Sequence, residues 1–213
     1  MIRAYSENYL SDSMDGMGAM LDFAVNSCGE DIGLFYSRFL SSGIARQMER
    51  GNPRYLCGLS GIEMALSVAA RTGSPVRMDD PRIDMGSPEY WTGWTLAYLQ
   101  WYLCMDFKSL QTAGVSVDSL MERYGTLHEA DLSKSVAFAK SRIETHRQNH
   151  NPLKAMRKNA GLSQRELAAL SGTTLRSIQA YEQSKLNLSK AESATIVSFS
   201  RTLGCMPSDL IGN

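Results

Sequence analysis

The sequence predicts an all-α protein with two domains. In the first 145 residues apolar side chains recur at helical spacing, and the strand-like alternation of apolar and polar residues is almost absent. The last third contains two short helices joined by a glycine turn. Hydrophobic residues make up 43% of the 213-residue chain, which is enough to bury a core in each domain.

Three helices are expected before residue 74. The first carries a methionine-rich stripe, begins after Asp12 or Ser13 and ends at Gly29. A second covers residues 32–42. The third opens with the capping-box sequence Ser60-Gly61-Ile62-Glu63 and ends at Gly73.

A long loop over 74–87, rich in proline, aspartate and arginine, is expected to be mobile, and an aromatic helix follows it from Pro88. That helix holds all three tryptophans, and its helical spacing implies one wide aromatic face. The simpler interpretation is a core helix. The alternative is a candidate ligand or partner surface, formed by Tyr90, Trp91, Trp94, Tyr98 and Trp101. Gly93 would let another backbone come close.

A long helix is expected before the C-terminal domain. The sequence Thr126-Leu127-His128-Glu129 resembles a capping box that would open it, and its apolar stripe ends at Ile143. Residues 146–151 are expected to be a polar linker, because Pro152 disfavours helix at Asn151. The predicted domains are therefore 1–145 and 152–213.

The glycine turn lies at Gly172. Ser163 can cap a helix that opens at Gln164, with Glu166 at the capping-box position, and Gly172 can end this helix in a left-handed conformation. Thr173 or Thr174 would cap a second helix over 174–183. Three residues of the first helix are expected to face inward, namely Leu167, Ala168 and Leu170. Ile178 and Tyr181 provide the apolar face of the second.

This segment resembles the DNA-binding domain of the Cro and phage-repressor class, the XRE family. The resemblance covers about 60 residues and includes the Leu-Ser-Gln opening, the Glu-Leu-Ala core, the turn glycine and a tail over 203–211. It implies a five-helix lambda-repressor-like fold, with helices at 153–159, 164–171, 174–183, 191–203 and 207–211. Ser184 stands where the family usually has glycine, which implies strain or a shifted loop there.

The resemblance also implies how DNA would be bound. Gln164 would clamp a phosphate at a helix N-terminus. Arg176 would contact a guanine edge, and Leu175 and Ala180 would contact thymine methyl groups, although an exposed arginine can also simply solvate a helix. The full set of implied DNA contacts is Gln164, Arg165, Thr173, Thr174, Leu175, Arg176, Ser177, Gln179, Ala180 and Lys185.

The chain has no net charge, but its charged residues are distributed unevenly along it. Residues 1–150 contain 14 Lys and Arg against 18 Asp and Glu, whereas 151–213 contain 8 against 4. Between Lys140 and Lys190 there are 10 basic residues and 3 acidic ones. This excess suits phosphate binding, although an ordinary solvated face would have the same composition.

Other chemistry is not indicated by the sequence. Cys28, Cys57, Cys104 and Cys205 show no metal-ligand or disulfide pattern and are expected to be reduced, mostly buried thiols. His146 and His150 have the spacing of two helix ligands but lie in a polar stretch, so no metal or cofactor is expected. No signal peptide or membrane span is expected, which predicts a cytoplasmic protein. No phosphate loop or nucleophile elbow indicates an enzyme.

The sequence therefore predicts a homodimeric transcriptional regulator, a repressor, that binds double-stranded operator DNA. Its N-terminal domain would dimerise, sense an effector or bind a partner protein. An antitoxin-like protein, whose N-terminal domain binds a neighbouring gene product, is the alternative. An N-terminal enzyme tethered to DNA is a third, weaker hypothesis.

Overall fold

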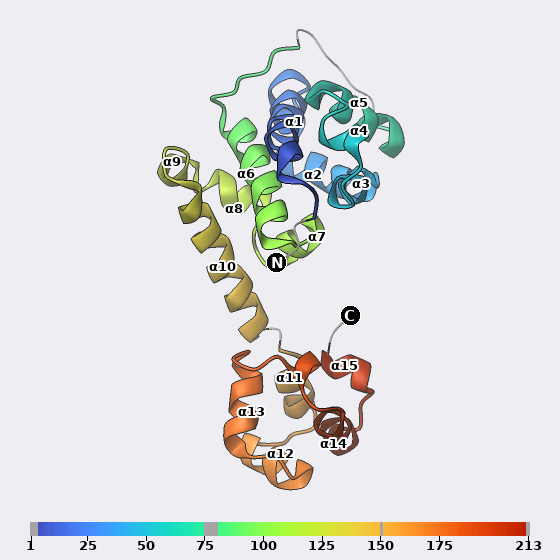
Figure 1. The fold of residues 1–213 in the computed structure, drawn as a ribbon, viewed down its shortest axis with the longest axis vertical. Helices are drawn as coiled ribbons and strands as arrows, with labels where there is room; N and C mark the ends of the chain where they lie inside the picture. The colour runs from blue at the N-terminus through green and yellow to red at the C-terminus, as the bar shows by residue number, and fades with distance from the viewer. Residues whose placement is uncertain (1–3, 75–80, 150, 212–213) are drawn as a thin grey trace. The chain divides into compact units, whose positions relative to one another are not determined.

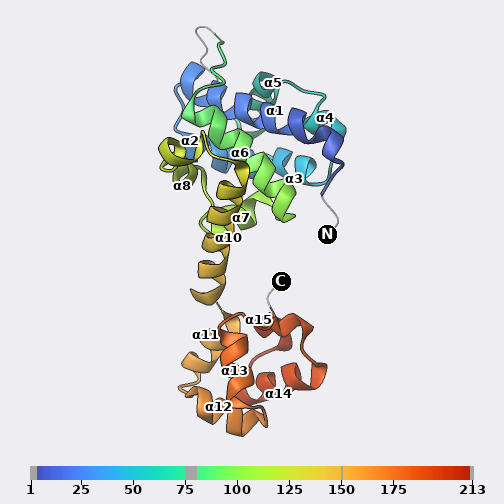
Figure 2. The same cartoon turned by 60° about the vertical axis from the view of Figure 1, so that its left-hand side comes forward.

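A computed structural model describes residues 4–74, 81–149 and 151–211. All regular secondary structure in the described residues is helical, and they contain no β-strand, as the sequence predicts (Figures 1 and 2). The chain divides into two compact units, 1–143 and 144–213, each with its own hydrophobic core. Residues 75–80 of the loop that was expected to be mobile lie outside the described residues.

The N-terminal unit is built around the packed pair of helices α1 and α6. The helices are α1 (Leu10–Asp22), α2 (Ile32–Ser41), α3 (Ile44–Glu49), α4 (Pro53–Leu56), α5 (Gly61–Thr72), α6 (Pro88–Leu103), α7 (Phe107–Thr112), α8 (Val117–Met121), α9 (Tyr124–Leu127) and α10 (Leu132–Asn149), which continues into the second unit. The predicted Ser60–Glu63 capping box and the stop at Gly73 are both present in α5.

Helix α1 begins earlier than the sequence suggested. A 3₁₀ turn over Glu7–Tyr9, capped by Ser6, leads directly into α1, so neither Asp12 nor Ser13 is the cap. The Ser13 side chain is buried instead, with its hydroxyl 3.0 Å from the Tyr5 hydroxyl. A π-helical turn over Phe23–Ser27 continues α1 before Gly29 ends it in a left-handed conformation.

Helices α1 and α6 approach each other backbone to backbone. A Cβ atom at Gly93 of α6 would lie 2.3 Å from the Met17 carbonyl oxygen, and one at Gly18 of α1 would lie 2.9 Å from the Tyr90 carbonyl oxygen. Only glycine fits at such distances. The expectation that Gly93 lets another backbone come close is therefore confirmed.

The aromatic residues of α6 contact different neighbours within the N-terminal unit. Tyr90 and Trp94 both donate to Asp15 Oδ1 at 3.2 Å, and Trp91 packs edge-on against Tyr124 with ring centres 5.7 Å apart. Ten of the 16 residues of α6 are buried, so the core interpretation is confirmed. Tyr98 and Trp94 remain half-buried at the surface.

Helix α10 begins five residues later than expected. The Thr126 hydroxyl donates to the Arg123 carbonyl oxygen rather than capping a helix, and Asp131 accepts from the Ser133 backbone amide at the true start. The helix continues to Asn149, so most of the segment expected to be a polar linker, 146–151, is helical.

The C-terminal unit contains five helices after α10. They are α11 (Pro152–Asn159), α12 (Gln164–Ser171), α13 (Leu175–Glu182), α14 (Ser193–Leu203) and α15 (Pro207–Ile211). They agree with the predicted positions, except that Ala191 follows a 3₁₀ turn and α14 starts two residues later. The core is formed by Leu153, Leu167, Ala168, Ile178, Leu188, Phe199 and Leu210.

Candidate nucleic-acid interface

Local hydrogen bonds set the boundaries of helices α12 and α13. The Ser163 hydroxyl accepts from the Glu166 amide at 3.2 Å, and the Glu166 carboxylate accepts from the Ser163 amide at 2.7 Å. The bond from the Ser163 amide, together with one from the Ser163 side chain, favours the ionised form of Glu166 and lowers the pKa of its carboxyl group. Gly172 ends α12 with φ of 68°, and Thr174 caps α13 by accepting from the Ser177 amide at 3.0 Å. Of the two candidate caps, Thr174 is the one used.

The two helices pack through small and branched apolar side chains. Leu167 and Ile178 are fully buried, and Ala168 is nearly so. Tyr181 meets Phe199 edge-on, with ring centres 6.1 Å apart. Leu170 was expected to face inward but is 64% exposed, because it lies on the side of α12 away from this core.

A buried ion pair holds α13 against α11. Arg157 Nε and Glu182 Oε1 lie 2.6 Å apart, and Arg157 Nη2 donates to Glu182 Oε2 at 3.0 Å. Hydrogen bonding to Glu182 raises the pKa of Arg157. The exposed fractions of the two residues are 9% and 3%. Sequence reasoning missed this pair, although a signal existed. Arg157 stands four residues after buried Leu153 and Glu182 four after buried Ile178, so both lie on inward faces.

Gln164 belongs to the same hydrogen-bond network. Its Nε2 atom donates to Glu182 Oε2 at 2.8 Å, and the side chain is half-buried. The amide group has a second N–H that this bond does not use. Gln164 is therefore fixed at the N-terminus of α12, where backbone amides and the helix dipole favour an anion.

The structure leaves the outer face of α13 accessible. Among the ten residues expected to contact DNA, Arg165, Thr174, Arg176, Gln179 and Lys185 are exposed, and the others are half-buried. Leu175 packs partly against the core of the unit. Apart from Gln164 and Arg165 on α12, all of them lie on α13 or within three residues of its ends.

Ser184 adopts the left-handed conformation in which the family usually places glycine. Its φ is 55°, and its amide donates to the Tyr181 carbonyl oxygen at 3.0 Å. A side chain in this region costs about 1–2 kcal/mol, because Cβ approaches the carbonyl oxygen. The strain expected from the sequence is therefore present, directly before Lys185.

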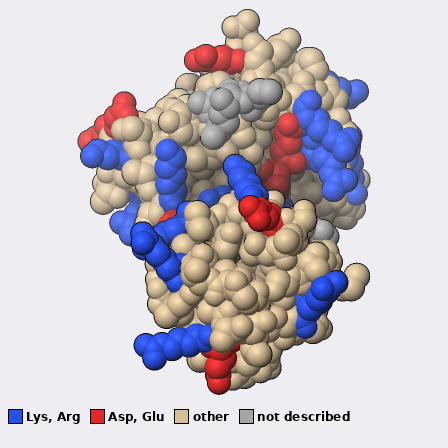
Figure 3. Space-filling model, turned by 60° about the horizontal axis from the view of Figure 1, so that its bottom comes forward, with Lys and Arg blue, Asp and Glu red and all other residues tan. Residues whose placement is uncertain are grey.

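Basic side chains are dispersed over the surface of the C-terminal unit. Figure 3 turns the lower part of Figure 1 towards the viewer and shows separate lysine and arginine side chains on a mostly uncharged surface there. Arg157 contributes little to the positive field, because it is buried and paired with Glu182. The exposed basic residues of the two-helix segment are Arg165, Arg176 and Lys185.

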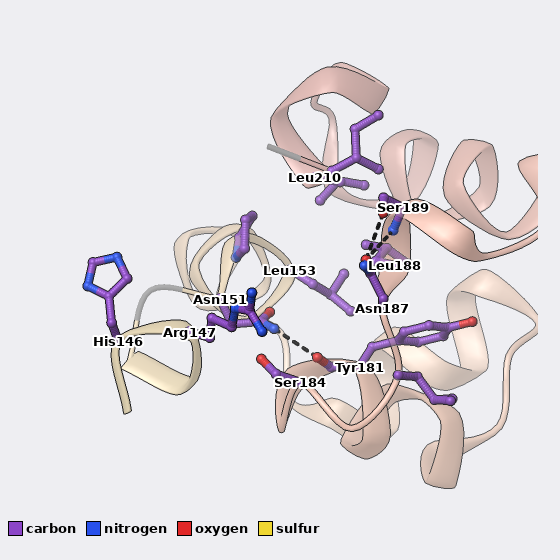
Figure 4. Close-up of a pocket in the computed structure, with 13 residues that line it drawn as sticks. His146, Arg147, Asn151, Leu153, Tyr181, Ser184, Asn187, Leu188, Ser189 and Leu210 are labelled. Carbon is purple, nitrogen blue, oxygen red and sulfur yellow. Dashed lines mark hydrogen bonds between the residues drawn. The ribbon is translucent and has the colours of Figure 1, made fainter. Parts of the chain in front are cut away.

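A cavity of about 310 Å³ lies in the C-terminal unit, and its lining includes Ser184 and Leu186, the two neighbours of Lys185. Figure 4 shows Tyr181, Leu188 and Leu210 among its lining side chains, and none of the ten expected DNA contacts lines it. At its edge Asn151 Nδ2 donates to the Tyr181 carbonyl oxygen at 2.8 Å, which ties the start of α11 to the end of α13.

Residues 153–205 match the protein-family model described as helix-turn-helix. The C-terminal unit contains a helix-turn-helix domain. It is of the XRE type, a DNA-binding domain of transcription regulators. The helix-turn-helix domain covers about a quarter of the chain, and the remaining residues are outside the match. Searches of curated proteins and of solved structures found no significant match.

The described residues contain no group of three or more metal-ligating side chains, and no helix among them is long and apolar enough to cross a membrane. The four cysteines are reduced, but the expectation that most are buried is wrong. Cys57 and Cys104 are exposed, because they follow the last residues of α4 and α6 at the surface.

Proposed function

We propose that this protein is a transcriptional repressor that binds operator DNA by placing α13 in the major groove. The observation that supports this proposal is the accessible outer face of α13 within a helix-turn-helix domain. The first helix of such a motif lies across the backbone while the second contacts base edges.

Arg176 is the proposed specificity residue. Its guanidinium is exposed near the N-terminus of α13, and no described residue forms an ion pair with it. Arginine can donate two hydrogen bonds to O6 and N7 of guanine, a geometry that no other base offers. Leu175 and Ala180 would contact thymine methyl groups.

Phosphate contacts would set the register of the domain. Gln164 would donate its second N–H to a phosphate, beside the backbone amides of α12. Arg165 and Lys185 would contribute charge, while Thr173, Thr174, Ser177 and Gln179 would contact the backbone or neighbouring bases. Such contacts position a domain without specifying sequence.

The N-terminal unit would supply dimerisation or bind an effector or partner protein. A symmetric dimer would place two copies of α13 about 34 Å apart and predicts a palindromic operator. Of the candidate effector surface, Trp94 and Tyr98 are the residues accessible enough to contribute. An antitoxin-like role stays a prediction, which co-purification with a neighbouring gene product would test.

Substitution of Arg176 tests the proposal. The duplex is first selected by the full-length protein from a random pool, and affinity is then measured for it and for single-base variants. Arg176→Ala should cost about 1–3 kcal/mol and relax the preference at one base pair. Arg201→Ala is the matched control, because Arg201 is exposed on α14. Equal affinity and equal base preference for wild type and Arg176→Ala would contradict the assignment.

A further inference from the structure

The basic residues among the first 107 positions of the chain are all of one kind. All eight basic residues before Lys108 are arginines, although the acidic residues outnumber the basic ones over 1–150. Arginine differs from lysine in presenting a planar fork that binds two oxygens of a phosphate or carboxylate at once. The composition therefore points to oxyanion binding rather than to solubility alone.

Two of these arginines contact one buried tyrosine. The guanidinium carbons of Arg54 and Arg71 lie 5.9 Å and 5.7 Å from the centre of the Tyr55 ring. Arg71 also donates to the Tyr55 hydroxyl oxygen at 2.6 Å and to the Ser42 carbonyl oxygen at 3.2 Å. These two bonds fix the position of the Arg71 guanidinium beside Tyr55.

Two further arginines lie on the adjoining helix. Arg46 is on α3 and Arg50 follows its last residue, and α3 packs against α4, which holds Arg54 and Tyr55. The side chains of Arg46, Arg50, Arg54 and Arg71, named here the arginine cluster, are all exposed. In Figure 3 blue side chains gather at the right-hand edge, the side on which Figure 1 shows α3 and α4.

The charge of the arginine cluster is not neutralised within the described part of the chain. None of its members forms an ion pair there. Glu49, the acidic residue directly before Arg50, is half-buried and accepts from the Phe107 amide at 2.9 Å, so its carboxylate is held against α7. Burial raises the pKa of Glu49 despite the opposing effect of Arg46. The cluster thus offers four outward cations beside a carboxylate that is directed elsewhere.

We infer that the arginine cluster is a second DNA contact, which binds backbone phosphates of the duplex held by the helix-turn-helix domain. This inference rests on the proposed function. It adds a sequence-independent contact from the N-terminal unit, in which the guanidinium groups donate to phosphate oxygens.

DNA is favoured over an acidic protein because of tethering. The helix-turn-helix domain is on the same chain, so a bound duplex has a high effective concentration near the N-terminal unit. An acidic partner would have to arrive from solution. DNA also carries closely spaced phosphates along its whole length, which matches several arginines on neighbouring helices without a specific partner surface.

The test uses full-length protein and a long duplex that carries the selected site at its centre. The triple variant Arg46→Gln, Arg50→Gln and Arg54→Gln removes three exposed cations and keeps Arg71, whose hydrogen bonds support the fold. Affinity is measured over a range of salt concentrations. The slope of log affinity against log salt should fall by about 0.9 for each phosphate that the variant no longer binds. The base preference should stay that of the wild type.

Two control variants show whether the salt dependence comes from the arginine cluster itself or only from the net charge of the unit. The triple variant Lys108→Gln, Arg123→Gln and Lys134→Gln removes the same charge from other exposed sites of this unit and should leave the slope near the wild-type value. Arg46→Lys, Arg50→Lys and Arg54→Lys keeps the charge and should retain most of the slope.

An unchanged slope in the triple glutamine variant, or an equal decrease in the charge-matched control, would overturn the inference while the proposed function stands. An acidic protein surface would then be the better occupant. If the wild-type protein selects no sequence and binds no duplex, both proposals fail together.

Discussion

Helix α6 in the N-terminal unit and helix α13 in the C-terminal unit differ in how much of their surface is left to solvent. Ten of the 16 residues of α6 are buried, whereas only Ile178 and Glu182 are buried among the eight residues of α13. Helix α6 carries all three tryptophans, and two of them are in the core. Aromatic residues of a kind that often forms binding sites can therefore be used for core packing instead. Their solvent accessibility in the folded protein shows which of the two roles they have.

The two helices are also held in place by different contacts. Helix α6 meets α1 at glycines, where backbone touches backbone, and the polar atoms there belong to Asp15, Tyr90 and Trp94. Helix α13 is held by an ion pair at its C-terminal end, and its N-terminal end is accessible to solvent. The following predictions test this contrast, in order of decreasing effect.

Removal of the buried ion pair should have the largest effect. Arg157→Met leaves Glu182 buried without its charge partner, which should reduce the free energy of unfolding of the C-terminal unit by about 3–5 kcal/mol. Urea unfolding followed by circular dichroism measures it. Tryptophan fluorescence reports the N-terminal unit separately, since all three tryptophans lie there. Lys158→Met, at an exposed neighbour, is the control and should be nearly neutral. If the two variants were equally stable, the Arg157–Glu182 ion pair would not contribute to the stability of the C-terminal unit.

Crowding at Gly93 should have the next largest effect. In Gly93→Ala the new Cβ would meet the Met17 carbonyl oxygen at 2.3 Å, so α1 and α6 must separate. We expect a decrease of about 1–3 kcal/mol in the free energy of unfolding of the N-terminal unit, measured by urea unfolding with tryptophan fluorescence.

Gly125→Ala is the matched control for this prediction. A Cβ at Gly125 of α9 meets nothing within 4 Å, so this change should stabilise the unit slightly through helix propensity. If both alanine variants raised stability, the close approach of α1 and α6 would be refuted.

Relief of strain at Ser184 should have a smaller, opposite effect. Ser184→Gly removes the Cβ from a residue with φ of 55° and should stabilise the C-terminal unit by about 1 kcal/mol. Thermal unfolding measured by circular dichroism checks this. Ser184→Ala keeps the Cβ and should not stabilise; a gain in that variant would assign the effect to the hydroxyl instead.

The pH dependence of the N-terminal unit should show the smallest effect. Burial, with a further contribution from Asp15, raises the pKa of Tyr90 from its ordinary 10.0 to about 12. The folded state therefore holds this proton more tightly than the unfolded state. The resulting stability is complete below pH 10 and decreases as pH rises towards 12. Tyr90→Phe should make urea midpoints fall less steeply over this range, and an unchanged slope would assign the alkaline destabilisation to other groups.

Helix boundaries predicted from residues that lie close together in the chain agreed best with the structure. The boundaries of α12 follow from Ser163, Glu166 and Gly172, which interact within the helix that they delimit. The same kind of reasoning failed at Thr126, because a capping-box pattern does not ensure that a helix starts there. Asp131 provides the cap that starts α10.

The all-α fold, the boundaries of the helix-turn-helix motif and the left-handed strain at Ser184 could all be predicted from the order of the residues. These features depend on backbone conformation and on hydrogen bonds between residues close in the chain. Three others required the folded chain, namely the pairing of Arg157 with Glu182, the exposure of Leu170 and the hydrogen bonds of Tyr90 and Trp94 to Asp15. The partners concerned lie 25 residues apart in the ion pair and 75 apart between Asp15 and Tyr90, so packing alone brings them together.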